Sequence, residues 1–292
     1  MIDKSEENIS IRRQCELLSV CRSKLFYVPL ESAINKEILS KINEIWIESP
    51  FYGYRKVTHE LRRRGYNVNH KKIQRLMSEN GIFALTPKRR MNTSKASNEQ
   101  KYPFLLKDVV IQRVNQVWST DISYIKMPCG FLYLAAIVDV YSRMIVGWSL
   151  STTMDTELCL TALRSAIEKY GTPEIVNSDQ GAQFTSEAWI AALKASNITI
   201  SMDGKGRWVD NVYVERVWRT IKQENVFLMD FQTVKEAKEE IGKFIDFYNF
   251  KRLHQNLDYK TPNDVYNGGC RVGGFVYAEL TELGALKLPP VV

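Results

Sequence analysis

The sequence is poor in the residues that build zinc sites and disulfide frameworks. Its 292 residues include five cysteines, none of them in a CxxC pair, and three histidines that lie far from the cysteines along the chain. A structural zinc site is therefore not expected. The polar start, MIDKSEENIS, is unlike a secretory signal, so disulfides are not expected either.

Long apolar runs are also missing. No stretch approaches the ~18–20 consecutive apolar residues that span a bilayer. We therefore expect a soluble, cytoplasmic protein with no membrane partner. With 45% apolar and 25% charged residues, the chain can build a sizeable core, and its length suits two domains.

Positive charge is concentrated in the first third of the chain. Residues 1–107 carry 21 Lys and Arg against 11 Asp and Glu, whereas residues 108–292 carry 19 against 22. A basic module joined to a near-neutral one suggests a part that grips a polyanion. A basic surface that only keeps the protein in solution would give the same numbers, so charge alone leaves both interpretations open.

The region over residues 1–85 is predicted to be helical. Apolar residues recur at helical spacing over residues 36–48 and 54–63, Gly65 can end the second helix, and Asn69 can cap a third. Two helices joined by a glycine-containing turn are typical of the helix-turn-helix motif. The outer face of the third helix carries donors suited to phosphates and base edges: His70, Lys71, Lys72, Gln74 and Arg75. An ordinary helical hairpin with a solvated basic face is the alternative.

A basic linker is predicted over residues 86–107. Its first part, TPKRRMNTSKASNEQK, has no periodic apolar residues and many small, polar or basic ones. Lys88, Arg89 and Arg90 are candidates for contacts along a DNA backbone.

From residue 108 the pattern changes to strands. Three runs rich in Val, Ile, Tyr and Trp predict an antiparallel meander: QVWSTDISYIKM, FLYLAAIVDV and MIVGWSLS. Helices and strands then alternate, with a long helix last. This order predicts an α/β core with a mixed sheet over residues 108–228, followed by a C-terminal helix and tail over residues 229–292.

Three acidic residues of this core occupy distinctive places. Asp121 lies within the first strand among apolar neighbours, Asp179 ends the strand EIVNSD, and Glu215 sits one turn into the last long helix. The intervals between them are 57 and 35 residues. Each acid alone is best read as a surface residue or a helix cap, but the set in this order predicts a metal site. Carboxylates are suited to Mg²⁺, and two such ions can break and rejoin a phosphodiester.

Two basic residues share the helix of Glu215. Arg219 follows it by four positions and Lys222 by seven, so all three are expected on one face. Cations on this face would hold a DNA backbone against the acids. A row of ion pairs on the helix surface, with no DNA contact, would show the same spacing.

The order of these motifs resembles the integrase-core transposases of bacterial insertion sequences. The resemblance is to the second reading-frame product (OrfB) of the IS-three family. It runs over nearly the whole chain, through STDISYI, IVDVYSRMIVGW, SDQGAQFTS, DNVYVERVWRTIKQE and FYNFKRLHQNLDYKTP. It implies a DDE-type enzyme with a ribonuclease H-like mixed five-stranded sheet, preceded by an all-α helix-turn-helix region. It also implies strand cleavage and strand transfer at the inverted-repeat ends of a mobile element.

Carried over to this chain, the resemblance makes Asp121, Asp179 and Glu215 the catalytic ligands of two Mg²⁺ ions, for which Mn²⁺ can substitute. Further positions match the loop after the second acid, the start of the last helix and the C-terminal motif: Gly181, Gln183, Phe184, Asp210, Asn211, Tyr248, Asn249, Arg252, His254, Thr261 and Pro262. In the C-terminal motif we expect packing or contact with a DNA backbone. Asp139 also falls at an acid typical of the family, and we interpret it as structural.

The resemblance also implies partners. These are DNA, further copies of the chain on that DNA, and the upstream reading-frame product, which supplies another DNA-binding domain through a frameshift fusion. Such an enzyme would act in the bacterial cytoplasm at the nucleoid. The chain departs from retroviral integrases in lacking their His/Cys zinc module. Two other functions fit part of the sequence, namely a regulator that binds DNA without catalysis and a ribonuclease H-like nuclease that cleaves without joining.

Overall fold

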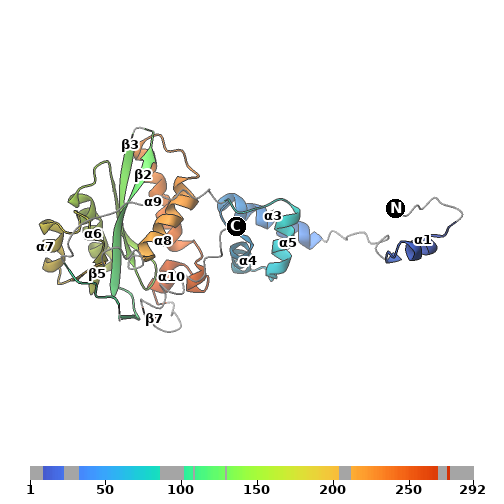
Figure 1. Ribbon diagram of the computed structural model, residues 1–292, viewed down its shortest axis with the longest axis horizontal. Helices are drawn as coiled ribbons and strands as arrows, with labels where there is room; N and C mark the ends of the chain where they lie inside the picture. Colours follow the sequence, from blue (N-terminus) through green and yellow to red (C-terminus); the bar gives the residue numbers. More distant parts are fainter. Residues whose placement is uncertain are drawn as a thin grey trace. The chain divides into compact units, whose positions relative to one another are not determined.

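The computed structural model describes residues 9–22, 33–85, 102–107, 109–128, 130–203, 212–268 and 275–276. The chain divides into two compact units, Met1–Ala84 and Leu85–Val292. Figure 1 shows helices alone in the first unit and a sheet flanked by helices in the second. Each unit is described by itself.

The first unit contains a group of three helices, α3 (Ala33–Glu48), α4 (Tyr54–Arg63) and α5 (His70–Glu79). Each helix buries one apolar stripe against the other two, as the predicted periodicity requires. The buried side chains come from all three helices: Ile38, Ile42, Ile45, Val57, Leu61, Ile73, Leu76 and Met77. A further helix, α1 (Ile11–Leu17), lies near the start of the chain.

The turn between α4 and α5 has the local chemistry that the sequence predicts. Gly65 adopts a φ of +91°, a conformation that other residues rarely adopt, directly after the end of α4. The Asn69 side chain then accepts a hydrogen bond of 2.9 Å from the Lys71 N–H and caps α5. The prediction of two helices joined by a glycine-containing turn is confirmed.

The second unit is built on a five-stranded mixed sheet in the order β4-β3-β2-β5-β6. Its strands are β2 (Val117–Met127), β3 (Gly130–Asp139), β4 (Ile145–Ser151), β5 (Ile175–Ser178) and β6 (Thr199–Met202). The first three form an antiparallel meander, and β5 and β6 add in parallel on the other side of β2. This is the mixed sheet expected for a ribonuclease H-like fold.

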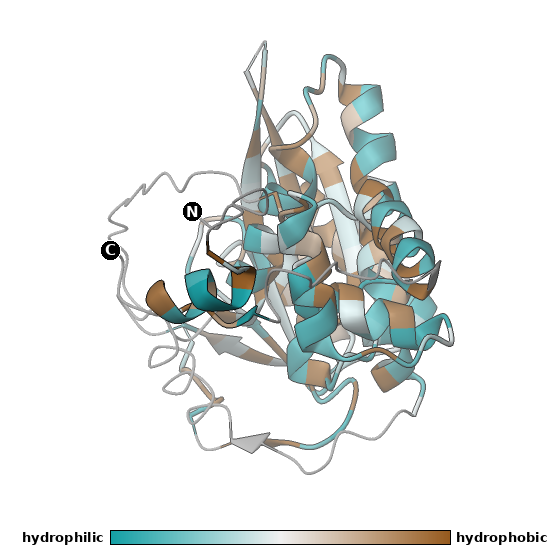
Figure 2. Cartoon of the chain, turned by 90° about the vertical axis from the view of Figure 1, so that its right-hand side faces the viewer, coloured by the Kyte–Doolittle hydropathy of each residue, from teal (hydrophilic) through white to brown (hydrophobic). Residues whose placement is uncertain are grey.

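Helices cover both faces of the sheet (Figure 1). Two of them, α6 (Thr156–Tyr170) and α7 (Glu187–Ala195), lie on one face and bury the main core with side chains such as Trp118, Leu163 and Trp189. On the other face lies α8 (Val212–Ile221), whose Tyr213 packs in a second cluster. Teal and brown segments alternate along the helices in Figure 2, as expected for helices with one buried face.

Several elements surround this core. The helix α8 continues directly into a π-helical turn, η2 (Lys222–Val226). It is followed by α9 (Val234–Phe250), the short 3-10 turn η3 (Gln255–Leu257) and α10 (Pro262–Tyr266). A small antiparallel pair, β1 (Val110–Ile111) with β7 (Phe275–Val276), was not predicted. No helix in the described ranges is both long enough and apolar enough to cross a membrane.

Candidate active site

Asp121 stands where the central strand leaves the core. Residues 117–120 of β2 are buried, whereas Asp121 is half-buried. The parallel neighbour β5 pairs with β2 only over Val117–Ser119, so in the described part of the chain β2 continues beyond that point beside β3 alone. Asp121 therefore lies two residues beyond the last residue of β2 that pairs with β5, where the sheet opens next to the carboxyl end of β5 and where sites form in open α/β sheets.

Asp179 follows directly after β5 at that same opening. Its Oδ1 accepts a 2.9 Å hydrogen bond from the Gly181 N–H, which folds the following loop back over the carboxylate. A Cβ at Gly181 would lie 3.0 Å from this oxygen, tighter than ordinary van der Waals contact. Glycine at this position therefore lets the backbone approach the carboxylate closely.

Glu215 is exposed in the first turn of α8. Three residues further on, the Trp218 Nε1–H donates a 2.9 Å hydrogen bond to Asp121 Oδ2. Residues three apart lie on the same side of a helix, so this bond brings the side of α8 that carries Glu215 to Asp121. Sequence reasoning missed Trp218. The available signal was an indole one turn after the third acid. Because Trp218 continues the apolar stripe of its helix, the sequence pattern gave no reason to treat it as anything other than a core residue.

The three carboxylates influence one another electrostatically. Burial, the negative charge of Asp179 and, to a smaller extent, that of Glu215 raise the pKa of Asp121 to about 7, against the opposing hydrogen bond from Trp218. Burial also raises the pKa of Asp179, and partial desolvation of its carboxylate by surrounding protein atoms raises that of Glu215. A group of acids whose charged forms are disfavoured in this way is typical of functional sites. A bound cation would stabilise the charged forms.

The donor set fits hard divalent cations. Within the described ranges, no group of three or more His, Cys, Asp or Glu side chains converges closely enough to hold one ion. Mg²⁺, however, is usually held by one or two carboxylates, with water and substrate phosphate as its other ligands. Carboxylates that interact in pairs, with Asp121 common to both pairs, are compatible with that kind of coordination.

The two basic residues of α8 lie differently. Arg219 is exposed, whereas Lys222 is half-buried in the first position of η2. Burial lowers the pKa of Lys222, and the charge of Asp121 opposes this shift, so the ammonium lies near the first acid. Its Nζ is 4.9 Å from the centre of the Tyr124 ring. The structure therefore brings Lys222 near Asp121. That Lys222 and Arg219 contact DNA stays a prediction.

The basic residues predicted to contact DNA from the first unit lie on the outside of α5. Lys71 and Arg75 are exposed and Lys72 is half-buried, opposite the buried Ile73 and Leu76. Arg75 forms only a 3.8 Å pair with Glu79, one turn away. Lys88, Arg89 and Arg90 lie outside the described residues.

Asp139 has a structural environment. It is fully buried at the end of β3, and its carboxylate accepts hydrogen bonds from the Asn115 N–H (2.8 Å), the Ser142 N–H (2.7 Å) and the Ser142 hydroxyl (2.6 Å). These bonds fix the turn between β3 and β4.

In the loop after Asp179, Phe184 packs on Trp189 and Gln183 donates to the Met154 carbonyl. Asp210 and Asn211 lie outside the described residues.

The C-terminal motif makes internal contacts. The Asn249 amide donates to the Ile145 carbonyl and accepts from the Ile145 N–H, both at 2.9 Å, so it pairs with β4 as a neighbouring strand would. Arg252 binds Glu224 of η2 through two hydrogen bonds in a largely buried ion pair. Thr261 and Asp264 form a capping box, with Pro262 at the first position of α10. Of the two expectations for this motif, packing accounts for these side chains.

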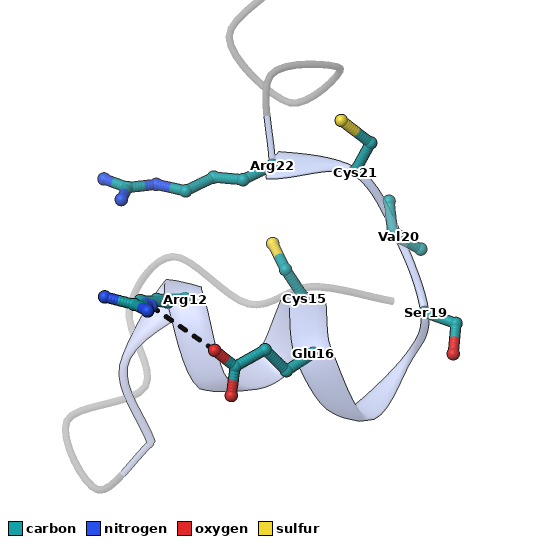
Figure 3. Close-up of a pocket in the computed structure, with 7 residues that line it drawn as sticks. All are labelled: Arg12, Cys15, Glu16, Ser19, Val20, Cys21 and Arg22. Atoms are coloured by element: carbon teal, nitrogen blue, oxygen red, sulfur yellow. Dashed lines mark hydrogen bonds and ion pairs between the residues drawn. The ribbon is translucent and has the colours of Figure 1, made fainter.

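A shallow pocket lies elsewhere, in the segment of α1. Figure 3 shows its lining residues, which all belong to the segment 12–22. The Arg12–Glu16 ion pair lies along α1 on one side of it. It contains none of the residues predicted to be catalytic, and α1 belongs to the first unit.

Comparison with known proteins agrees with this description. The chain matches the integrase core domain over residues 111–207 and again over residues 196–262, and an HTH-like domain over residues 33–90. Solved structures that resemble it include the HTLV-2 integrase catalytic core domain in complex with magnesium. That structure covers 53% of this chain and 97% of its own, at 22% identity and a TM-score of 0.45. The matches to the integrase core family, over the residues that form the sheet and its flanking helices, define an integrase-core polynucleotidyl transferase.

Curated relatives narrow this class. The transposase for insertion sequence element IS904 of Lactococcus lactis is 36% identical over 245 residues, which cover 81% of this chain and 96% of that protein. Transposase InsF for insertion sequence IS3A of Escherichia coli is 29% identical over 279 residues, covering 91% and 97%. The chain belongs to the insertion-sequence transposases with an integrase core, and it is a DNA transposase.

Proposed function

We propose that Asp121, Asp179 and Glu215 are the catalytic residues of this transposase and that together they hold two Mg²⁺ ions, with Mn²⁺ as a substitute. The observation that carries this proposal is the electrostatic coupling of Asp121 to the other two acids beside the open edge of β2. When bound, such ions activate an attacking hydroxyl and stabilise the leaving oxygen of a phosphodiester.

The chemistry consists of two displacements at phosphorus. In cleavage, a water oxygen bonds to phosphorus and the bond from phosphorus to the 3′ oxygen breaks; the water loses a proton and the leaving 3′ oxygen gains one, which gives a 5′ phosphate and a free 3′ hydroxyl. In strand transfer, the oxygen of that 3′ hydroxyl bonds to a target phosphorus and displaces the 3′ oxygen of the target strand; the attacking hydroxyl loses its proton and the displaced oxygen gains one. The Trp218 N–H and the Gly181 N–H orient two of the carboxylates and partly offset the rise in their pKa, because each donates to the charged form. Arg219 and Lys222 bind the DNA backbone.

The central test is Glu215→Gln in the full chain. The amide keeps the size of the side chain but is a poor ligand for Mg²⁺. We expect cleavage and strand transfer of a DNA substrate to fall below detection, while DNA binding in gel shifts stays within about twofold, because little positive surface changes. Activity retained with Mg²⁺ would exclude Glu215 from the site. Cleaved but unjoined product from the wild-type chain would favour a nuclease.

The basic face of α5 supplies the DNA-binding surface in this proposal, with Lys88, Arg89 and Arg90 continuing it along the linker. It can be tested with Lys71→Gln, Lys72→Gln and Arg75→Gln. Each phosphate contact releases counterions, so each loss should flatten the dependence of log Kd on log salt by about one unit. Lys235→Gln on α9 is a control, since this exposed lysine lies in the other unit. Salt slopes that match the control would remove α5 from the DNA interface.

The reaction also implies assembly. Both ends of a mobile element must meet before transfer, so at least two copies of the chain act together on DNA at the bacterial nucleoid. The upstream reading-frame product is the second proposed protein partner, either fused or bound. Sedimentation of the chain with and without end DNA measures the first expectation, and co-purification measures the second.

A further inference from the structure

The outer half of the β2–β3 hairpin carries an unusual pair of aromatic side chains. Tyr124 on β2 and Phe131 on β3 are 51% and 50% exposed, although most of β3 beyond Phe131 is buried. Their ring centres are 5.8 Å apart, and the rings meet edge to face. The strand register pairs Tyr124 with Tyr133 and Lys126 with Phe131, so all four side chains belong to one face of the hairpin.

A cation from a different element completes this surface. The Lys222 ammonium lies 4.9 Å from the centre of the Tyr124 ring and close enough to Asp121 for the two charges to interact. Tyr124 is three residues from Asp121 along β2, so the two side chains leave the strand on opposite faces, and Lys222 reaches both at the edge that β5 leaves open. One lysine therefore connects the exposed rings to the proposed catalytic acids.

The composition of this surface fits nucleic acid bases. Two half-exposed rings offer flat apolar area, and the adjacent ammonium groups of Lys222 and Lys126 can neutralise phosphate. Aromatic rings interleaved with cations are the pattern with which proteins hold single-stranded DNA, because every base can stack. A buried protein interface, by contrast, is depleted of lysine.

We propose that Tyr124 and Phe131 form a stacking platform, with Lys222 beside it, that holds unpaired bases of the DNA strand close to the phosphate being cut. This inference rests on the proposed function of the acidic triad. It adds a substrate form, namely DNA that is locally unpaired next to the scissile position. The platform would favour strand separation at the site because unpaired bases gain a stacking partner there.

The test compares two fluorescein-labelled probes with the full-length chain in EDTA. One probe is a 20-base-pair blunt duplex, and the other is the same duplex with a single-stranded extension of three thymidines. We expect wild-type protein to bind the extended probe about tenfold more tightly, as one well-stacked base would provide. The double variant Tyr124→Leu with Phe131→Leu should lose this preference while its affinity for the blunt duplex changes less than twofold.

Controls separate stacking from other effects. Tyr124→Phe keeps the ring and should keep the preference, as should Phe250→Leu, which removes a comparably exposed ring from α9. If the double variant melts early, crosslinking of wild-type protein to 5-iodouracil in the extension decides, with Tyr124 or Phe131 as the expected attachment site. The platform would be overturned if a folded double variant kept the preference or if the crosslinks formed at other residues. It would also be overturned if the double variant changed its sedimentation but not its DNA preference.

The outcome is independent of the triad. Binding is measured without metal, and Glu215→Gln should retain the preference for the extended probe. If Glu215→Gln still cleaves DNA while the double variant loses its preference, the triad assignment fails and the platform stands. The reverse combination would remove the platform and leave the triad.

Discussion

Two carboxylates on neighbouring strands of the same sheet have opposite surroundings. Asp139, at the end of β3, is fully buried, accepts three hydrogen bonds from Asn115 and Ser142, and has the cation Arg143 nearby. Asp121, in the middle of β2, is half-buried, accepts from Trp218, and faces two other acids. Burial raises the pKa of both.

The difference shows how a structural acid can be distinguished from a proposed catalytic one. A buried carboxylate with a full set of donors is already stabilised by the fold and has little need for a further cation. A carboxylate whose nearest charges are also negative is stabilised fully only when something positive binds. The first kind should contribute to stability, and the second should reduce stability in return for function.

The largest expected effect comes from Asp121→Asn. Loss of a shared metal ligand should lower cleavage and strand transfer by at least about 10³-fold, since metal assistance supplies several kcal/mol. The melting temperature in EDTA should stay the same or rise, because the amide removes a charge that Asp179 and Glu215 repel. Cleavage assays with Mg²⁺ and thermal melts measure the two quantities. A large fall in melting temperature would show that Asp121 is structural after all.

Asp139→Asn is the matched change on the neighbouring strand. The amide nitrogen must face either the Asn115 N–H or the Ser142 N–H, so at least one buried donor loses its acceptor. We expect the free energy of unfolding to fall by about 2–3 kcal/mol. Urea denaturation measures this loss. The Mg²⁺ concentration that gives half-maximal activity of the folded fraction should not move, and a shift in it would place Asp139 in the catalytic site.

A smaller effect should follow from Trp218→Phe. The ring still fills the space between α8 and the sheet, but the hydrogen bond to Asp121 Oδ2 is lost. A hydrogen bond to a charged group contributes about 1.5 kcal/mol, so the Mg²⁺ concentration for half-maximal activity should rise about tenfold. Trp189→Phe is the control, because this indole lies on the opposite face of the sheet against Phe184. Equal Mg²⁺ titrations for the two variants would deny Trp218 a positioning role.

Local patterns in the sequence were sufficient for most elements of the fold. Runs rich in Val, Ile, Tyr and Trp located β2, β3 and β4 to within about one residue, and the Asn69 cap and the Gly65 turn were identified from residue type alone. These features depend on neighbours in the chain, so a sequence displays them directly. The three acids could likewise be picked out, because charged residues are conspicuous beside apolar strands, although their metal binding stays a prediction.

Contacts between distant segments could not be predicted in this way. The Trp218 bond to Asp121 joins residues 97 apart, and the Asn249 amide pairs with Ile145 across 104 residues. Neither side chain breaks the periodicity of its own helix, so nothing local marks it. The π-helical turn that places Lys222 beside Tyr124 is equally invisible, because its register depends on packing of α8 against the sheet.

The smallest expected effect is on the pH dependence of stability, and it sharpens the comparison between Asp121 and Asp139. The pKa of Asp121 is about 7 in the fold, against an ordinary value of 3.8. A group whose pKa rises on folding stabilises the fold fully below its unfolded value, and this contribution is lost as the pH rises towards the folded value. Metal-free protein should therefore lose stability through Asp121 between about pH 4 and pH 7.

Thermal melts in EDTA at pH 5 and pH 8 can isolate this contribution. Asp121→Asn removes the titrating group, so the melting temperature should fall less between these two pH values in the variant than in the wild type. Because Asp121 is partly exposed and water screens its charge, we expect a difference of only a few degrees. Mg²⁺ should remove the difference by binding the ionised form, so its stabilising effect on the wild type should grow from pH 5 to pH 8. Identical pH dependence in the two proteins would mean that burial and the charges of Asp179 and Glu215 do not raise the pKa of Asp121.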